Sequence, residues 1–411
     1  MKILQINGVI HQGSTGEIVD SINSYLDVKN IEHKTCYGIG KKCLDGFKFC
    51  YRFEQALYRR CSMITGFRYG FAPISTKKVI NYIEKYNPDI VHLHSINGNC
   101  INLYKLIKYL KETNRITIIT NHAEFFYTGN CTSTYGCKQY MTGCIECPHK
   151  IWASDYALFP KTHKAWIKMK NTFKGFTRGY MVSVSDYIKQ SAESSPLVED
   201  LHHVRILNGI NIMTFKPTYT IDIKTQYNIG IDKKICVFVT SEFSKDKEHL
   251  KGGYWLLKVA KDMKKMNYHF LVVGNSNEDE KAYDNISFIG RVYDKEILAN
   301  IYSQADVALS FSKSESFGMT CSEALCCGTP VAGFKCGGME SIALSEYSRF
   351  CDYGDIKSFI NNIIELTDIH KNESNIISNV SRETYSRERM AKQYFELYQE
   401  VINTDEDNRI N

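Results

Sequence analysis

Two glutamates in the second half of the chain are spaced so that they could hold a sugar and its phosphates. Glu315 precedes, and Glu323 follows, a point near Gly318 or Met319 where the pattern predicts that a helix begins. The first N–H groups of a helix have no partner within it and carry its positive dipole end, so this point can bind an anion. Carboxylates on either side can accept hydrogen bonds from hydroxyls of a sugar or a ribose. The pattern therefore predicts a phosphate site flanked by two hydroxyl-binding carboxylates.

A glycine-containing stretch follows the first apolar run of the chain. Residues 6–16, INGVIHQGSTG, nearly match the P-loop pattern, but Ser14 stands where the lysine should be. The dinucleotide pattern fails as well, because no two glycines here are separated by one residue. A strand, a glycine turn and a helix start remain. Gly13 and Gly16 would then let the backbone approach a phosphate, and a plain tight turn is the alternative.

Length and composition predict two ordinary globular domains. The chain has 411 residues, more than the roughly 250–300 that one hydrophobic core usually serves. Hydrophobic residues make up 43% and charged residues 23%, as in ordinary globular proteins. The sequence starts without the features of an export signal, and no apolar run approaches the roughly 20 residues that span a bilayer. We therefore expect a cytoplasmic protein whose fifteen cysteines are mostly reduced or metal-bound.

Apolar runs rich in β-formers alternate with helical patterns, which predicts an α/β fold with parallel sheets and crossover helices. Strands are expected at 2–7, 90–93, 117–120 and 180–184 in the first half, and at 235–240, 270–273, 287–289, 307–309 and 330–333 in the second. Ligands of such sheets bind beyond the carboxyl ends of the strands. Residues that directly follow these strands are therefore the first candidates for a site.

The two domains are expected to meet near residue 206. The stretch 206–217 runs from a strand into an Asn-Gly turn and ends on a proline. We therefore predict a first domain at 1–206 and a second at 207–385. Residues 386–411 would contain a last helix, capped by Ser386, that returns to the first domain.

Several further motifs accompany Glu315 and Glu323 in a fixed order. They are NGI at 208–210, KG at 251–252, FIGRV at 288–292, ADV at 305–307, CGTPV at 327–331 and GGME at 337–340. Together with the E-x7-E spacing they resemble the retaining glycosyltransferases of family 4, the bacterial polysaccharide, O-antigen and capsule type among them. The resemblance implies the GT-B fold, in which two Rossmann-like domains with parallel sheets face each other across a cleft.

By this resemblance, the second domain binds a nucleoside diphosphate sugar. Glu323 would bind the ribose, and Glu315 with the backbone at Phe317 and Gly318 would hold the sugar and the diphosphate. Lys251 would neutralise the diphosphate as it leaves. The resemblance adds three more residues to the donor-binding set: Arg291, Val292 and Met319.

One position departs from the family pattern. Members usually carry an arginine several residues before the lysine, and the segment 241–251 contains none. Lys245 or Lys247 would take its place, the alternative being that these lysines are merely solvated. An ammonium offers a point charge where guanidinium offers a fork, so we expect the diphosphate contacts to differ from the family's.

In the first domain, the resemblance assigns a contact with the donor sugar to His122, at a predicted strand end. Gly13 and Gly16 would approach the diphosphate from the opposite side. Considered alone, a histidine at a strand end is more often structural. His92 and His94 also lie at a strand end, where we favour hydrogen-bonded structural residues over a role on the acceptor side.

A cysteine-rich insertion occupies residues 130–148. Cys131, Cys137, Cys144 and Cys147 include one C-x2-C pair. Four thiolates can surround zinc tetrahedrally. A structural zinc ion is therefore one interpretation, and free or paired thiols are the other.

The chain is mildly basic, with a formal charge of +6 and a pI near 8.4. Two stretches, 51–60 and 163–174, combine basic and aromatic residues. Such helices can dock on an anionic membrane surface, although a solvated helix face is the commoner explanation. No nucleic-acid recognition motif is present, so no nucleic-acid partner is expected.

These features together predict an enzyme that moves a hexose from a nucleoside diphosphate sugar to a growing, lipid-linked glycan in cell-surface polysaccharide synthesis. The anomeric configuration would be retained and no metal cofactor would be required. The enzyme would work in the cytoplasm, on the inner face of the plasma membrane. The alternatives are another GT-B enzyme, such as a nucleotide-sugar epimerase or a phosphorylase, and a non-catalytic nucleotide-sugar-binding or zinc-dependent scaffold.

Overall fold

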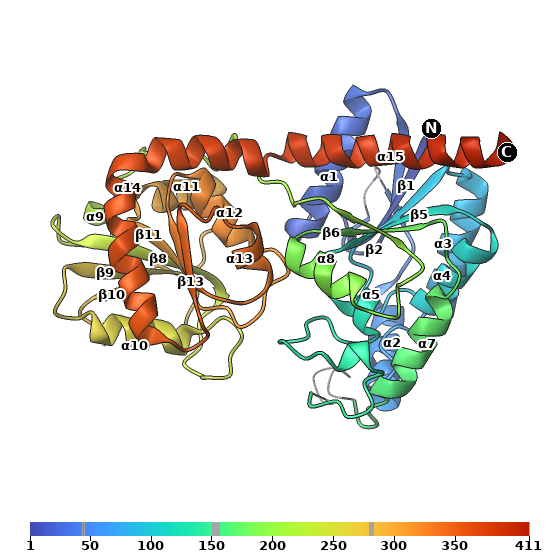
Figure 1. Cartoon of the computed structure of the whole chain (residues 1–411), viewed down its shortest axis with the longest axis horizontal. Coiled ribbons are helices and arrows are strands. Elements are labelled where there is room, and N and C mark those ends of the chain that lie inside the picture. The colour runs from blue at the N-terminus through green and yellow to red at the C-terminus, as the bar shows by residue number, and fades with distance from the viewer. Residues whose placement is uncertain (43, 45, 150–156, 279–282, 411) are drawn as a thin grey trace. The chain divides into compact units, whose positions relative to one another are not determined.

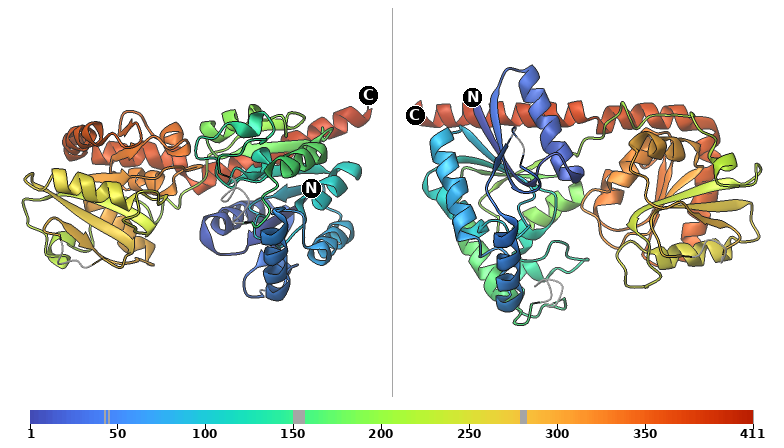
Figure 2. Two further views of the ribbon diagram at one scale, coloured as in Figure 1. Left: turned by 90° about the horizontal axis from the view of Figure 1, so that it is seen from below. Right: turned by 180° about the vertical axis from the view of Figure 1, so that it is seen from behind.

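The computed structural model describes residues 1–42, 44, 46–149, 157–278 and 283–410, and it divides into two compact units (Figure 1). Unit 1 comprises Met1–Leu207 and Met390–Asn411, and unit 2 comprises Asn208–Arg389. Each unit contains a parallel sheet with helices on both faces (Figure 2). The expected fold class, α/β with two Rossmann-like halves, is confirmed.

Within the described residues, seven strands form the sheet of unit 1 in the order β3-β2-β1-β4-β5-β6-β7. The inner strands β1 and β5 are buried along nearly their whole length, as expected where helices cover both faces of a parallel sheet. The strands are β1 (Lys2–Val9), β2 (Glu32–Ile39), β3 (Gly46–Lys48), β4 (Ile90–Leu93), β5 (Ile116–Asn121), β6 (Gly179–Ser183) and β7 (His202–Arg205).

The helices of unit 1 include one from the far end of the sequence. Helix α15 (Arg387–Ile410) packs on the sheet, where Tyr394 and Tyr398 join a buried cluster with Ile3 and Ile118. The other helices are α1 (Gly13–Val28), α2 (Arg52–Thr65), α3 (Pro73–Tyr86), α4 (Leu103–Glu112), α5 (Phe125–Thr128), η1 (Gln139–Met141), α7 (Thr162–Phe173) and α8 (Asp186–Glu193).

Within the described residues of unit 2, six strands form a sheet in the order β10-β9-β8-β11-β12-β13. They are β8 (Lys234–Glu242), β9 (Tyr268–Asn275), β10 (Ile286–Phe288), β11 (Val307–Ser310), β12 (Val331–Phe334) and β13 (Ser348–Cys351). The helices are α9 (Ile223–Gln226), α10 (Gly253–Asp262), α11 (Lys295–Gln304), α12 (Met319–Cys326), α13 (Gly338–Ile342) and α14 (Ile356–Tyr385). The core of one face joins Leu256 of α10 and Phe359 of α14 to Phe238 and Phe270 of the sheet.

Both sheets contain a point where the strand order reverses. The neighbours there are β1 and β4 in unit 1, and β8 and β11 in unit 2. At such a switch point the loops that follow the two strands leave in opposite directions, and ligands of open α/β sheets bind there. The fold thus marks one candidate location in each unit.

The nine strands expected from the sequence are all present, with ends that differ by at most two residues from those observed. Four others, β2, β3, β7 and β13, were given no bounds, although a strand was expected to run into the Asn-Gly turn that follows β7. The edge strand β7 reads HHVR and is partly exposed, β3 has three residues, and β2 begins with the polar run Glu32-His-Lys34. Strands at or near a sheet edge are less buried, so their apolar pattern is weak.

Candidate functional site

At the switch point of unit 2, a glycine lets two loops come together. The loop that follows β8 is joined to the loop that follows β11 by a hydrogen bond from the N–H of Lys313 to the carbonyl of Leu250, at 2.9 Å. Gly252 has a φ of 71°, and a Cβ added there would overlap the carbonyl oxygen of Phe311. Only glycine adopts this conformation without strain and leaves room for the carbonyl. The KG motif therefore places Lys251 beside the second loop.

Lys251 forms an ion pair with Glu315 across these loops. Its Nζ donates to Oε1 of Glu315 at 2.6 Å, and the two side chains are 36% and 22% exposed. The structure thus brings together two residues that lie 64 positions apart and that were both expected in the site. A pair this open to solvent contributes little to stability, so its charges can be exchanged for those of a ligand.

The GGME motif at 337–340 holds the backbone of Glu315 in place through hydrogen bonds. The N–H of Glu315 donates to the carbonyl of Cys336 at 3.0 Å, and the N–H of Gly338 donates to the carbonyl of Glu315 at 2.8 Å. The carboxylate of Glu340 accepts from the N–H groups of Cys336 and Gly337 at 2.9 and 2.7 Å. A Cβ at position 338 would lie 2.6 Å from the carbonyl oxygen of Glu315. The motif therefore supports the backbone of Glu315.

Helix α12 begins at Met319, as the sequence predicts. Gly318 caps it with a φ of 93°, and Phe317 before it is buried. The first backbone bond toward Gly318 comes from the N–H of Cys321, at 3.0 Å. The N–H groups that precede it cannot bond within the helix. They give this end of α12 the anion-binding character expected of it.

Glu323 lies one turn further along α12 and is partly buried. It comes near Tyr302 of α11, whose pKa is raised well above its ordinary value by burial and then by the charge of Glu323. The carboxylate expected to bind a ribose is therefore on the helix, whereas Glu315 is in the loop that precedes it, as predicted.

Two other predicted donor residues have partners of their own. Lys245 bonds through Nζ to Oε2 of Glu278 at 2.6 Å, and this hydrogen bond raises the pKa of Lys245. Arg291 is exposed, and its Cζ lies 4.9 Å from the ring centre of Tyr293. Val292 beside it is partly buried. The structure thus joins Lys251 to Glu315, but it does not bring Lys245 or Arg291 to that pair.

In unit 1 the glycine stretch forms a compact turn after β1. Gly13 opens α1 with a φ of 65°, and a Cβ at Gly16 would lie 3.3 Å from the backbone nitrogen of His11. The N–H of Gly8 donates to the carbonyl of Ser95 at 2.8 Å, which ties the turn to the loop after β4. The predicted order of strand, glycine turn and helix start is what the structure shows, and it lies at the switch point of unit 1.

His122 follows β5 directly and is partly buried. Its Nε2 lies 3.3 Å from Nδ1 of His94, and the two rings stack with centroids 5.6 Å apart. Burial lowers the pKa of His122 to about 4, so the ring is neutral at pH 7. The sequence indicated His122 but not its partner, because the two residues lie on neighbouring strands that only the sheet brings together.

The cysteine-rich loop is anchored by a buried carboxylate. Glu124 accepts a hydrogen bond from the N–H of Thr134 at 2.9 Å, and burial raises its pKa. Cys131, Cys137 and Cys144 form no disulfide with another described cysteine. Burial, followed by the charges of Cys147 and Cys137, raises the pKa of Cys144 to about 12.

The four thiols are near neighbours without forming a ligand set. Each of the other three affects the pKa of Cys131, although burial is the main cause of its rise. Among the residues that the structure describes, no group of three or more His, Cys, Asp or Glu side chains is arranged to hold a metal ion. A structural zinc ion therefore stays a prediction.

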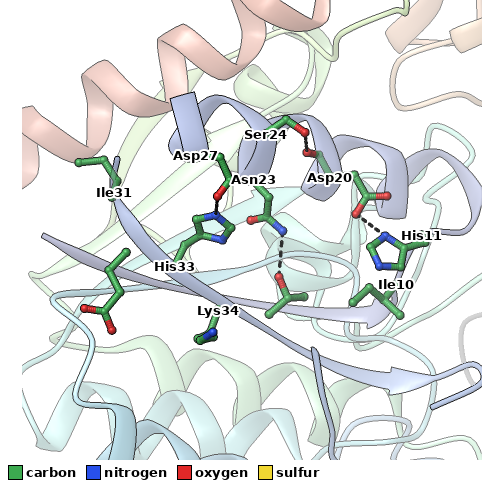
Figure 3. A pocket seen from close by; sticks show the side chains of 11 residues that line it. Ile10, His11, Asp20, Asn23, Ser24, Asp27, Ile31, His33 and Lys34 are labelled. Atoms are coloured by element: carbon green, nitrogen blue, oxygen red, sulfur yellow. Dashed lines mark hydrogen bonds and ion pairs between the residues drawn. The ribbon is translucent and has the colours of Figure 1, made fainter. Parts of the chain in front are cut away.

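A polar hollow of about 760 Å³ lies on unit 1 between α1 and the start of β2 (Figure 3). His11 is paired there with Asp20 at 2.8 Å, and His33 with Asp27 at 2.9 Å. Asn23 lines the same hollow and donates to the hydroxyl of Thr35 at 3.0 Å. The hollow is therefore a polar surface in which each of the two histidines is paired with a carboxylate.

Part of the sequence is similar to that of a known enzyme family. Residues 233–368 match the family described as glycosyl transferases group 1. The N-acetyl-alpha-D-glucosaminyl L-malate synthase of Bacillus anthracis is 24% identical over 241 residues, which cover 54% of this chain and 61% of that protein's length.

Solved structures are similar over nearly the whole chain. A sucrose-phosphate synthase from Thermosynechococcus elongatus has a TM-score of 0.69 at 17% identity and covers 98% of this chain and 99% of its own. HepE from Anabaena in complex with UDP-glucose has a TM-score of 0.60 at 16% identity and covers 97% and 100%. At these identities the likeness shows the fold. Residues 233–368 are thus similar to group 1 glycosyl transferases, and the chain has the GT-B fold of these structures.

Proposed function

We propose that this protein transfers a hexose from a nucleoside diphosphate sugar to an acceptor hydroxyl with retention of the anomeric configuration. The observation that carries the proposal is the ion pair of Lys251 and Glu315 beside the N-terminal end of α12. A cation, free amides and a carboxylate together match a diphosphate joined to a sugar. The family match over the same residues, and UDP-glucose in a structure of the same fold, support the donor class.

In the proposed reaction the ion pair opens when the donor binds. The diphosphate takes the place of Glu315 as the partner of Lys251, and the released carboxylate accepts hydrogen bonds from sugar hydroxyls. Glu323 binds the ribose diol. The anomeric carbon–oxygen bond then breaks toward an oxocarbenium-like state, and the diphosphate leaves with the electron pair. Lys251 and the amides at the start of α12 stabilise this charge as it develops.

The acceptor hydroxyl attacks the anomeric carbon on the face from which the diphosphate departs. Its proton passes to the departing phosphate oxygen, so that the step is balanced without a covalent intermediate. Glu315 holds the sugar in place and is not assigned as a nucleophile. His122 contributes a neutral imidazole to the sugar contact, in agreement with its lowered pKa.

The donor half of the proposal is tested by thermal stabilisation with a panel of nucleotide sugars. A ligand at 100 times its dissociation constant stabilises the native state by about 2.7 kcal/mol. We expect a nucleoside diphosphate hexose to raise the melting temperature, and proton NMR of the product to show the donor's anomeric configuration. An inverted product, or no stabilisation by any member of the panel, would rule out the proposal.

We further propose that the acceptor is a lipid-linked glycan of the cell surface, reached at an anionic membrane. Among the described helices, none combines the length and apolar content needed to cross a bilayer. Helix α2 nevertheless turns apolar side chains to solvent: Phe53 is 72% exposed, Leu57 55% and Ile64 52%. Arg59 and Arg60 are exposed as well.

The opposite face of α2 is the polar one. Glu54 is buried there and accepts a hydrogen bond from the hydroxyl of Ser75 at 2.7 Å, and Ser62 is buried as well. Exposed Leu158 continues the apolar surface, since its N–H donates to the carbonyl of Met63 at 2.7 Å. An apolar face rich in arginine fits the boundary of an anionic lipid layer. The second basic stretch is less suitable, because Trp166 of α7 is engaged with the carbonyl of Tyr140.

Liposome sedimentation tests this face. The native protein should bind vesicles that contain phosphatidylglycerol and release them at high salt. Phe53→Ser/Leu57→Ser and Arg59→Glu/Arg60→Glu should each abolish binding, whereas Lys164→Glu on exposed α7 serves as the charge control. Unchanged binding by both α2 variants would contradict the assignment. Transfer to a small hydroxy acid in place of a lipid-linked glycan would direct the acceptor proposal to the class named in the Bacillus anthracis relative.

A further inference from the structure

We propose that a chain of hydrogen bonds through unit 1 fixes which ring nitrogen of His122 carries the proton. Gln5 and His94 are then positioning residues for the sugar contact of His122. The link to the sugar rests on the proposed function, whereas the proton assignment rests on unit 1 alone.

The chain connects five side chains: two on strands β1 and β2, one on helix α1, and two that directly follow β4 and β5. His122 Nε2 lies 3.3 Å from His94 Nδ1, and His94 Nε2 lies 2.8 Å from Gln5 Oε1. Gln5 Nε2 donates to Asn23 Oδ1 at 2.5 Å, and Asn23 Nδ2 donates to Thr35 Oγ1 at 3.0 Å. The outer end, at Asn23, opens on the polar hollow of Figure 3. The inner end is the imidazole at the carboxyl end of β5.

Because its members are buried, their polar groups must form hydrogen bonds with one another. Gln5 and His94 have no solvent-exposed surface, and buried polar groups must find partners within the protein. An amide has a donor end and an acceptor end, so each link sets the direction of the next. The carbonyl oxygen of Gln5 faces His94. In this orientation of the Gln5 amide, His94 carries its proton on Nε2.

The position of the proton on His94 then determines which nitrogen of His122 donates. Burial lowers the pKa of both histidines, so both rings are neutral at pH 7 and each has one donor and one acceptor nitrogen. With its proton on Nε2, His94 accepts at Nδ1, and His122 must donate to it from Nε2. The Nδ1 of His122 is then an acceptor, and a sugar hydroxyl that meets it must be the donor.

The neighbouring His92 provides a matched control. It is buried to the same extent, and its ring lies against that of His94 with centroids 3.9 Å apart and the planes tilted by 36°. Its own partners lie outside the chain: Tyr398 through Nδ1 at 2.7 Å and Thr120 through Nε2 at 2.8 Å. Thr120→Val therefore removes a buried hydrogen bond of similar kind without breaking the link from Gln5 to His122.

Long-range 1H–15N NMR of the full-length protein with labelled histidine tests the assignment directly. His94→Gln and His122→Gln identify the two signals. In the native protein both rings should show the Nε2–H tautomer. An Nδ1–H signal for His122, or an averaged one, would overturn the proposal, and this readout needs neither a variant at Gln5 nor any activity.

Variants at Gln5 add the functional link. In Gln5→Leu the Nε2–H of His94 would be buried without an acceptor, so we expect both rings to change to the Nδ1–H tautomer. Transfer should fall roughly tenfold through mispositioning of the sugar, with binding of UDP itself unchanged. Thr120→Val should change neither the His122 tautomer nor the donor-sugar selectivity.

The outcomes separate the two proposals. Should Gln5→Leu not fold, the tautomers of the native protein still decide the inference. If the tautomers of His94 and His122 were unchanged in a folded Gln5→Leu variant, the proposal that the hydrogen-bond chain fixes them would be refuted. A native protein with the expected tautomers but no transfer from any nucleotide sugar would refute the proposed function and leave the assignment of the protons intact.

Discussion

The two switch points have the same topology but opposite solvation. In unit 2 the groups are charged and partly open to water, with Lys251 and Glu315 paired across two loops that glycines bring together. In unit 1 the groups are neutral, with Gln5 and His94 fully buried and His122 partly buried at the end of the hydrogen-bond chain. An open pair can exchange its partner for a ligand's charge, whereas a buried network holds one geometry. In the proposed reaction, the charged pair of unit 2 would bind the diphosphate and the neutral network of unit 1 would orient the sugar.

The largest effect should come from removing the exchangeable carboxylate of unit 2. Glu315→Ala is expected to lower transfer by about 10²–10³-fold, the range seen when a group that stabilises a transition state is removed. The free energy of unfolding should change by less than about 1 kcal/mol, since the pair is partly exposed. Steady-state transfer rates and urea denaturation measure the two quantities.

A second lysine–glutamate pair of unit 2, that of Lys245 and Glu278, is the control for that result. Glu278→Ala breaks the bond to Lys245 at the same distance of 2.6 Å, but it leaves Lys251 and Glu315 untouched. Transfer should stay within about threefold of the native rate, as for a surface pair. Equal losses in the two variants would mean that the first pair has no special place in the reaction.

A smaller loss of transfer is expected when the contacts between the GGME motif and the backbone of Glu315 are disturbed. Gly338→Ala places a Cβ 2.6 Å from the carbonyl oxygen of Glu315, so the loop must shift, at a cost of about 1–3 kcal/mol. Transfer should fall by roughly 10–100-fold, because small misplacements of reacting groups are costly. Gly16→Ala in unit 1 meets the His11 backbone only at 3.3 Å and should cost less stability. The reverse ranking would show that the tight contact is in unit 1.

The neutral network of unit 1 predicts a dependence of stability on pH. The folded pKa of His122 is about 4, below the ordinary value near 6.5, so the unfolded chain binds more protons between these values. Stability is then fully present above about pH 6.5 and is lost as the pH falls toward 4, by up to about 3 kcal/mol from this residue. His94 contributes in the same direction.

Denaturation at pH 7 and pH 5 compares His122→Gln with the native protein. The variant should lose less stability over this interval, because glutamine takes up no proton. If both lost the same amount, the acid sensitivity would have to come from groups outside this network.

The sequence was sufficient for features with a local signature. Strands such as 90–93, the helix start at Met319 and the glycine turn after β1 follow from apolar periodicity and glycine placement. The bounds of edge strands such as β7 could not be predicted, because a partly exposed strand lacks a continuous apolar run. The E-x7-E spacing and the KG motif identified Glu315 and Lys251 separately.

The partners within the site could not be predicted, since they depend on which strands become neighbours. Nothing in the sequence joins Lys251 to Glu315, Lys245 to Glu278 or His122 to His94, each pair being brought together by loops from adjacent strands. The GGME motif was recognised in the sequence. That Glu340 holds the backbone beside Glu315 is seen only from its hydrogen bonds in the structure. Ion pairs and buried networks are properties of the folded sheet, and a single sequence records only their members.

Calorimetric titration of UDP-hexoses into Lys251→Ala and Lys245→Ala tests the exchange of partners most directly. The account predicts that loss of Lys251 weakens binding of the preferred donor at least about 30-fold, a cost of about 2 kcal/mol within the range for hydrogen bonds to charged groups. Loss of Lys245 should weaken it less than threefold. Equal affinities for the two variants, or an undiminished affinity of Lys251→Ala, would contradict the claim that Lys251 passes from Glu315 to the diphosphate.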